Sequence, residues 1–205
     1  MASPDGDAQA RIPPRRITDT TTARAVVLVE GVSDRLALEQ LAARRGRDLG
    51  AEGIAVVPMG GTKSIGAFLE RLGPAGMGLR LAGLCDAGEE GDVLRALERA
   101  GMGSGLTRAT MEAVGFFVSE ADLEDELIRA LGADEVMRII EAQGELGRFR
   151  TFQRMPQKRD QAVEAQLRRF MGTRSGRKQQ YAPLLVDALD LSHVPRPLDG
   201  VLAHV

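Results

Sequence analysis

One stretch constrains the fold of this chain more than any other: an unbroken apolar run, Ala25–Val29, leads directly into Glu30. A Val- and Leu-rich run that ends at a turn is typical of a strand buried on both faces, as in a parallel sheet. Ser33 then offers a helix N-cap, and residues 35–42 carry apolar side chains at helical spacing. We therefore expect Glu30 at the carboxyl end of a strand, where open α/β sheets bind ligands, and Asp34 in the next helical turn.

Three further segments, 53–59, 80–86 and 113–118, have the same strand character. Segments with helical periodicity follow each of them, at 65–72, 90–100 and 123–131. Strands that alternate with helices at this spacing predict βαβ units in a parallel sheet. The predicted fold class is therefore α/β, with about four parallel strands between helices.

After residue 132 the pattern predicts helices but no strand. Helices are expected at 134–146, 159–171 and 179–189, and Pro195, Pro197 and Gly200 indicate an irregular end. The predicted organisation is a disordered tail at residues 1–22, an α/β catalytic core at 23–133, and a basic helical extension at 134–205.

Composition indicates the cellular compartment in which this chain is expected to function. The single cysteine, Cys85, excludes an internal disulfide framework and fits a reducing compartment. No apolar run approaches the roughly 20 residues that a membrane span needs, and the amino terminus lacks an apolar signal segment. We expect a cytoplasmic protein without a membrane partner.

Charge is distributed unevenly, although the formal net charge is only −2. Residues 85–145 contain fifteen Asp and Glu against five Arg, whereas residues 147–180 contain ten Lys and Arg against two acids. An acidic centre beside a basic segment suits a metal site that takes a polyanionic substrate. Two solvated helical faces of opposite sign would give the same counts.

Carboxylates stand where three of the predicted strands end: Glu30, Asp86, and the pair Asp122 and Glu124. These ends meet at one edge of a doubly wound sheet, and clustered carboxylates repel one another unless a cation neutralises them. Oxygen ligands suit Mg²⁺ or Mn²⁺. The acids after the fourth strand could instead serve only the positive end of a helix dipole, which would not account for Glu30 or Asp86.

Two other features of the sequence bear on ligand binding. The Gly-Gly-Thr-Lys turn that contains Lys63 does not match a P-loop, but it opens a helix whose amino terminus could approach a phosphate. An ordinary turn with a solvated lysine is the alternative. The two histidines, His193 and His204, lie near the carboxyl terminus and are expected to be solvated.

The order Glu-Gly-x-x-Asp, then an Asp after the third strand, then Asp-Leu-Glu resembles the Toprim domain, the metal-binding module of topoisomerases, primases and several nucleases. The form Val-Glu-Gly-Val-Ser-Asp is most similar to its OLD-type (overcoming lysogenization defect) branch, and the resemblance covers residues 25–132. It implies that one or two metals are held by five acids: Glu30, Asp34, Asp86, Asp122 and Glu124. It also implies a lysine beyond the acidic motifs that stabilises the scissile phosphate, for which Lys178 is the candidate.

Two departures from that pattern matter. Toprim domains usually carry Asp-x-Asp after the third strand, but Gly88 occupies the second position here, so Glu89, Glu90 or Asp92 would have to supply the missing oxygen. We take Glu90 as the additional metal ligand; without one, two-metal catalysis is in doubt. Longer OLD-type proteins carry an ABC-type ATPase ahead of the Toprim part, so this chain is expected to act alone or with a separate ATPase partner.

The leading hypothesis is a Mg²⁺- or Mn²⁺-dependent endonuclease that hydrolyses or nicks DNA, with Glu30, Asp86 and Lys178 as catalytic residues. The alternatives are a catalytically weak or inactive module that binds metal or nucleic acid for a partner ATPase, and a small ribonuclease of the RNA-maturation type. DNA is favoured over RNA, and a homodimer remains open. The residues expected to bind nucleic acid are Lys63, Arg148, Arg150, Arg168, Arg169, Arg174 and Arg177.

Overall fold

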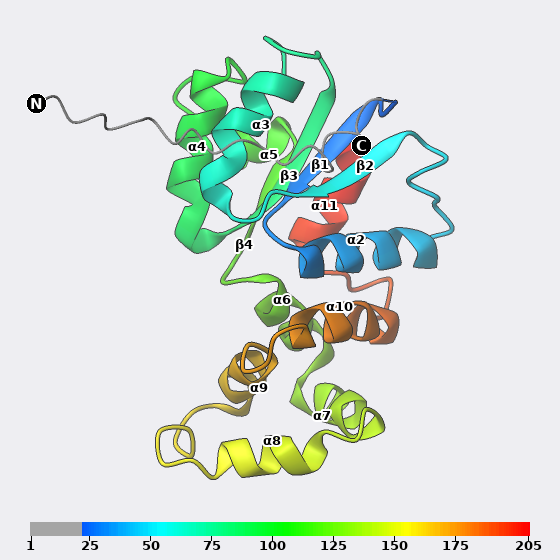
Figure 1. Ribbon diagram of the computed structural model, residues 1–205, viewed down its shortest axis with the longest axis vertical. Coiled ribbons are helices and arrows are strands. Elements are labelled where there is room, and N and C mark those ends of the chain that lie inside the picture. Colours follow the sequence, from blue (N-terminus) through cyan, green and yellow to red (C-terminus); the bar gives the residue numbers. More distant parts are fainter. Residues whose placement is uncertain (1–21) are drawn as a thin grey trace, which may run out of the picture.

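The computed structural model describes residues 22–205, so the tail predicted at residues 1–22 lies outside the described residues apart from its last position. The described chain is elongated, with an α/β layer at one end and a group of helices at the other (Figure 1). Its sheet has four strands, all parallel, in the order β2-β1-β3-β4, which confirms the predicted fold class. The strands are β1 (Ala25–Val29), β2 (Ile54–Pro58), β3 (Arg80–Asp86) and β4 (Phe116–Ser119).

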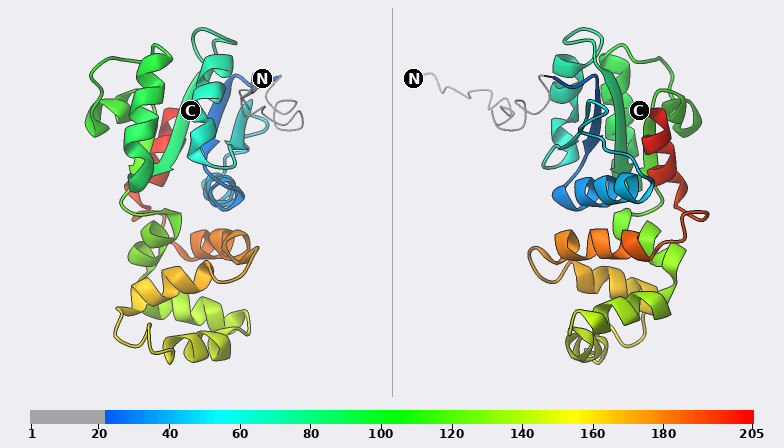
Figure 2. Two further views of the ribbon diagram at one scale, coloured as in Figure 1. Left: turned by 60° about the vertical axis from the view of Figure 1, so that its left-hand side comes forward. Right: turned by 90° about the vertical axis from the view of Figure 1, so that its right-hand side faces the viewer.

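The central strand β1 is buried along its whole length, as its apolar run predicts. Its residues alternate between two cores: Val26 and Leu28 join one cluster, whereas Val27 and Val29 join the other. Helices cover both faces of the sheet (Figure 2). One face carries α3 (Ile65–Leu72), α4 (Glu90–Arg99) and α5 (Arg108–Ala113), and the other carries α2 (Val32–Arg44) and α11 (Arg196–His204).

The remaining helices extend the second core away from the sheet. They are α6 (Leu123–Leu131), α7 (Ala133–Ala142), α8 (Leu146–Gln153), α9 (Val163–Met171) and α10 (Arg177–Ala188). Helix α10 lies along α2 and joins the two parts of the molecule (Figure 1). At the end of this contact Arg44 Nη1 donates hydrogen bonds to the carbonyl oxygens of Val186, at 2.6 Å, and Leu189, at 2.8 Å.

A buried ion pair holds the helical part together. The Arg177 guanidinium donates to the two carboxylate oxygens of Glu145, both at 3.1 Å, and stacks at 4.0 Å from the centre of the Phe170 ring. The Tyr181 hydroxyl donates to the same carboxylate at 3.1 Å. These contacts join the loop before α8 to α9 and α10, and they leave Tyr181 fully buried.

Several local predictions were wrong. The cap of α2 is Gly31 rather than Ser33, and the fourth strand begins at Phe116 because residues 108–113 form the short helix α5. The prolines near the end do not indicate irregular structure, since Pro195 and Pro197 stand at the start of α11, where proline is tolerated. Helix α8 was also missed.

The position of α11 changes the surroundings of His204. This residue is partly buried rather than solvated, and its ring lies against Gly115, whose φ of 91° and missing side chain leave the necessary room. The last residues of the chain therefore return to the α/β layer. Among residues 22–205 no helix has both the length and the apolar character that crossing a bilayer requires.

Because α11 packs closely on the sheet, replacing its glycine by alanine should destabilise the protein, although this substitution in a helix usually stabilises. Replacing a helical glycine by alanine usually stabilises a protein by about 0.5–1 kcal/mol. A Cβ at Gly200 would lie 2.2 Å from Cε1 of Phe117 on β4, so Gly200→Ala should lower the free energy of unfolding by about 1–3 kcal/mol in urea titrations.

The matched control is Gly147→Ala in α8, where a Cβ would meet nothing within 4 Å. This variant should be neutral or should raise the free energy of unfolding by up to about 1 kcal/mol. Equal stabilisation by both substitutions would contradict the packing of α11 against β4.

Candidate functional site

Three neighbouring strands, β1, β3 and β4, end in or just before carboxylates at one edge of the sheet. Glu30 follows β1, and Asp86 is the last residue of β3. The register pairs Asp86 with Ser119 of β4, three residues before Asp122. Asp122 adopts an extended conformation and caps α6, since its Oδ1 accepts a hydrogen bond from the backbone N–H of Asp125 at 2.9 Å. The strand order thus collects these side chains without any unusual loop.

The pKa values show that the carboxylates lie within electrostatic reach of one another. Burial raises the pKa of Asp86 to about 7, and the charges of Glu30, Asp122 and Asp34 add to this shift. Burial also raises the pKa of Asp34 to about 6, although a hydrogen bond from the backbone N–H of Gly31, at 2.7 Å, lowers it. The site therefore holds like charges whose repulsion is only partly relieved.

Glu124 and Lys178 form the innermost ion pair of this group. The Glu124 side chain is 5% exposed, and its Oε2 accepts a hydrogen bond from Lys178 Nζ at 2.6 Å. Burial raises the pKa of Glu124, whereas Lys178 opposes that rise. The other carboxylate oxygen, Oε1, is buried without a hydrogen-bond partner in the described chain. Lys178 thus reaches the acidic edge from the first turn of α10.

The structure does not bring Glu90 to the cluster. Glu90 begins α4 and its carboxylate pairs with Arg108, which lowers the pKa of Glu90. The preceding residue, Glu89, lies close to Glu30, at the end of a short 3₁₀ turn at residues 87–89. Burial raises the pKa of Glu89, and so do the charges of Glu30 and Asp92. One oxygen of Glu89 is buried without a hydrogen-bond partner.

The donor set suits a hard divalent cation, but the ligands are not assembled around one point. Within residues 22–205 no three His, Cys, Asp or Glu side chains are gathered closely enough to hold a metal ion. Cationic side chains engage two of the acids instead: Lys178 pairs with Glu124, and Arg168 Nε lies 2.8 Å from Asp122 Oδ2. Mutual repulsion, oxygen-only donors and the unpartnered oxygens of Glu89 and Glu124 are features that suit a hard divalent cation.

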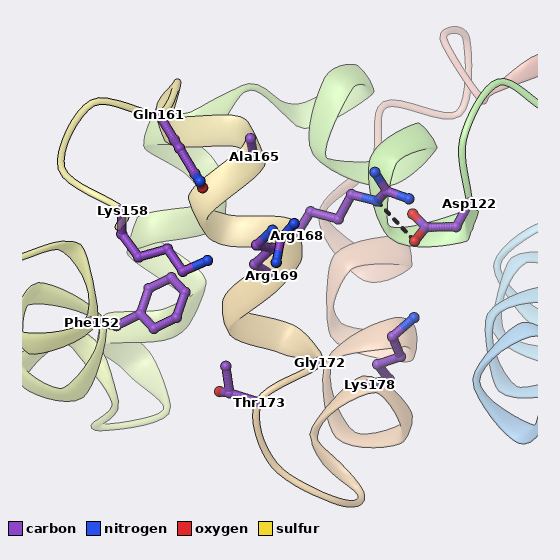
Figure 3. A pocket seen from close by; sticks show the side chains of 10 residues that line it. All are labelled: Asp122, Phe152, Lys158, Gln161, Ala165, Arg168, Arg169, Gly172, Thr173 and Lys178. Atoms are coloured by element: carbon purple, nitrogen blue, oxygen red, sulfur yellow. Dashed lines mark hydrogen bonds and ion pairs between the residues drawn. The ribbon is translucent and has the colours of Figure 1, made fainter. Parts of the chain in front are cut away.

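An open cavity of about 750 Å³ is lined by Asp122, from the acidic edge, and by residues of the basic helix α9. Figure 3 shows Arg168 reaching from α9 to Asp122, with Lys178 beside this pair and Lys158 farther along the cavity. The acidic and basic regions of the sequence therefore meet on one surface. The lining residues are Asp122, Phe152, Lys158, Gln161, Ala165, Arg168, Arg169, Gly172, Thr173 and Lys178.

Other predicted nucleic-acid contacts lie outside this cavity. Arg148 and Arg174 pair with Glu145, Arg150 donates to Gln153, and Lys63 is exposed in the 3₁₀ turn after β2. Arg177 is a correction, because its side chain is 5% exposed and its guanidinium is fully engaged inside the helical part. The sequence could not reveal this, since the partner Glu145 lies 32 residues away.

Lys158 and Phe152 line the cavity but were not among the predicted site residues. Lys158 belongs to the basic stretch at residues 147–180, so charge density was the only available signal. Nothing in the local pattern separates it from Arg154 or Arg159, which line a different hollow together with Arg150.

Comparison with known proteins agrees with this geometry. Residues 22–87 match the family model "Overcoming lysogenization defect protein-like, TOPRIM domain". Over these residues the chain is similar to an OLD-like Toprim domain. The matched segment runs from β1 to the turn after β3 and includes Glu30, Asp34 and Asp86. Among curated proteins, none matches the chain significantly.

Solved structures extend the similarity in fold over nearly the whole chain. The C-terminal region of the Xanthomonas campestris pv. campestris OLD protein has a TM-score of 0.71 at 23% identity and covers 91% of this chain and 94% of its own. The C-terminal region of the Burkholderia pseudomallei OLD protein has a TM-score of 0.69 at 20% identity, with 89% and 96% covered. The helices after the Toprim strands therefore also share the OLD fold.

Removing one of the crowded charges should stabilise the metal-free protein. At about pH 8, above the pKa of Asp86, Asp86→Asn should raise the melting temperature in EDTA by about 2–4 °C, which corresponds to roughly 1 kcal/mol. The same substitution should reduce the further rise that Mg²⁺ produces in the wild-type protein. Differential scanning fluorimetry measures both effects.

Glu70→Gln is the matched control, since Glu70 is exposed on α3 and away from the acidic edge. Its melting temperature should follow that of the wild type with and without Mg²⁺. A destabilised Asp86→Asn protein that retains the full Mg²⁺ response would contradict the view that the carboxylates repel one another.

Proposed function

We propose that this chain is a Mg²⁺- or Mn²⁺-dependent nuclease that hydrolyses phosphodiester bonds, with DNA as the favoured substrate. The observation that carries the proposal is that carboxylates stand at three neighbouring strand ends, and that one of them, Asp122, lines a cavity together with cations from α9 and α10. A divalent cation needs the first group, and the phosphates of a nucleic acid need the second. The OLD-like Toprim match supports this reading of the site.

The metal would be held by Glu30, Asp34, Asp86, Asp122 and Glu124, with Glu89 in the role first given to Glu90. When bound, it would lower the pKa of a water molecule and stabilise the leaving oxygen. Glu30 serves as a metal ligand or general base, because it follows the central strand β1 and lies among the other acids. Gly88 leaves no carboxylate at the usual second position, and Glu89 compensates from one residue farther along.

Lys178 has two roles in this proposal. Without a metal it neutralises Glu124, and with a metal and substrate present it is free to stabilise charge on the scissile phosphate. Its side chain is 43% exposed at the cavity, so it can exchange one partner for the other without unfolding α10. Arg168 relates to Asp122 in the same way.

The exchange of partners predicts opposite effects of Lys178→Ala on binding and cleavage. Loss of the neighbouring positive charge should strengthen Mn²⁺ binding about fivefold, equivalent to roughly 1 kcal/mol, in isothermal titration calorimetry. Cleavage should fall at least about a hundredfold, because the charge on the phosphate is no longer stabilised. Arg138→Ala, on the exposed surface of α7, should change neither. Weaker metal binding in Lys178→Ala would contradict the exchange.

A supercoiled-plasmid assay with Mg²⁺, Mn²⁺, Ca²⁺ or EDTA tests the activity itself. The wild type and Glu70→Gln should nick DNA only with Mg²⁺ or Mn²⁺, while Glu30→Gln and Asp86→Asn should be slower by about a hundredfold or more. Wild-type cleavage in EDTA, or full activity in both site variants, would overturn the proposal. If plasmid is not cut, single-stranded RNA tests the ribonuclease alternative with the same variants.

A second candidate function is a module that binds metal or nucleic acid for a separate ATPase without cutting. The observation that favours it is that two of the acids are already neutralised: Glu124 by Lys178, and Asp122 by Arg168. This candidate predicts Mn²⁺ binding by calorimetry with no cleavage of DNA or RNA under any divalent cation. Metal-dependent cleavage by the isolated chain would exclude it.

A further inference from the structure

The cavity contains two cations that no carboxylate neutralises. Arg168 and Lys178 at its acidic end are paired with Asp122 and Glu124. Lys158 and Arg169 also line the cavity, and neither forms an ion pair within the described chain. Two unpaired cations beside a paired set leave this end of the cavity with a net positive charge that suits an anion.

The loop that carries Lys158 is held in place by buried contacts. The Gln166 side chain, which is 5% exposed, donates to the carbonyl oxygens of Lys158 at 2.8 Å and Gln161 at 3.0 Å. Its own oxygen accepts a hydrogen bond from Gln153 at 2.6 Å. A buried amide that bonds three separate points fixes the loop against α8 and α9, so the position of Lys158 is set by the fold.

Aromatic packing also surrounds the Lys158 side chain. The Lys158 ammonium lies 5.7 Å from the centre of the Phe152 ring, and that ring packs at 5.8 Å against Phe170 in α9. Phe149 contacts Phe170 from α8 at 5.2 Å. The Lys158 side chain extends toward the helix that carries Arg168 and Arg169 (Figure 3). The cations therefore form a row across α9, from the loop to the acidic edge.

We propose that Lys158 and Arg169 form a phosphate subsite for a nucleic-acid strand whose scissile phosphate lies at the acidic edge. The strand would run across α9, with its next phosphates on these two cations. This inference rests on the proposed function for the direction of the strand, but the subsite itself requires only binding. It adds Lys158 to the site and leaves Arg148, Arg150 and Arg174 outside the substrate path.

The test is the salt dependence of binding, measured by fluorescence anisotropy with a short fluorescein-labelled DNA duplex and its single strand. All variants carry Glu30→Gln to prevent cleavage, and Ca²⁺ is present. Each phosphate contact contributes about 0.7–0.9 to the slope of log K against log[salt]. The double variant with Lys158→Ala and Arg169→Ala should therefore reduce the slope by about 1.5. A double variant with Lys158→Arg and Arg169→Ala should lose only about half as much.

Arg154→Ala is the matched control, because Arg154 lies in the same loop but lines a different hollow. It should leave the slope within about 0.3 of the starting value. An unchanged slope in the double variant, or an equal loss in Arg154→Ala, would overturn the subsite. The duplex and the single strand distinguish which form of the backbone the subsite prefers.

Failure of the subsite and failure of the nuclease proposal give different results. If the chain binds DNA with the predicted change in slope but does not cut it, the nuclease proposal fails and the subsite stands. If wild-type protein cuts DNA and Lys158→Ala with Arg169→Ala changes neither the slope nor the KM, the subsite fails alone. A raised KM at an unchanged kcat supports it, since the two cations would position substrate without taking part in the chemistry.

Discussion

Repulsion among partly buried carboxylates at the sheet edge is the constraint on which the site depends. The parallel order β2-β1-β3-β4 brings Glu30, Asp86 and Asp122 to one edge, and burial beside the other two carboxylates makes the charge on Asp86 costly. A sheet with these ends and no cations nearby would be destabilised at neutral pH. The chain relieves the repulsion through Lys178 and Arg168, which both come from helices beyond the Toprim strands.

This dependence gives a role to the buried contacts that stabilise the helical part. Lys178 can reach Glu124 only if the first turn of α10 is fixed, and its neighbour Arg177 fixes that turn through Glu145, Thr173 and the Phe170 carbonyl. Breaking a buried pair of this kind typically costs about 3–5 kcal/mol, because the remaining charge is left without a partner. The packing of α10 along α2 then connects the pair to the sheet. The electrostatics of the site thus depend on the stability of the helical part, which positions Lys178.

Most of the sheet edge was predictable from the sequence because its signals are local. Apolar runs that end in a carboxylate correctly indicated β1 and β3, and the position of Glu30 and Asp86 followed directly. Lys178, the candidate for the lysine beyond the acidic motifs, does lie beside the acids, although its catalytic role stays a prediction. The sequence could not separate Glu90 from Glu89: after the 3₁₀ turn at residues 87–89, Glu90 pairs with Arg108 and Glu89 lies near Glu30, and a metal-ligand role for either stays a prediction.

What could not be predicted depends on distant partners. Arg177 looks like any other arginine of the basic segment until Glu145 and Tyr181 surround it. Helix α11 was missed because its prolines signal a break in the sequence, whereas the structure uses them at a helix start against β4. Lys158 gains its importance from Gln166 and Phe152, neither of which a charge count reveals.

The central claim is that a divalent cation replaces Lys178 and Arg168 as the charge that neutralises the acidic edge. Anomalous scattering from a crystal soaked in Mn²⁺ measures this directly. The account predicts a manganese peak adjoining Glu30, Asp86 and Glu124, with the Lys178 ammonium displaced from Glu124. A peak elsewhere on the molecule, or an undisturbed Lys178–Glu124 pair in a crystal that contains no bound manganese at this edge, would contradict it.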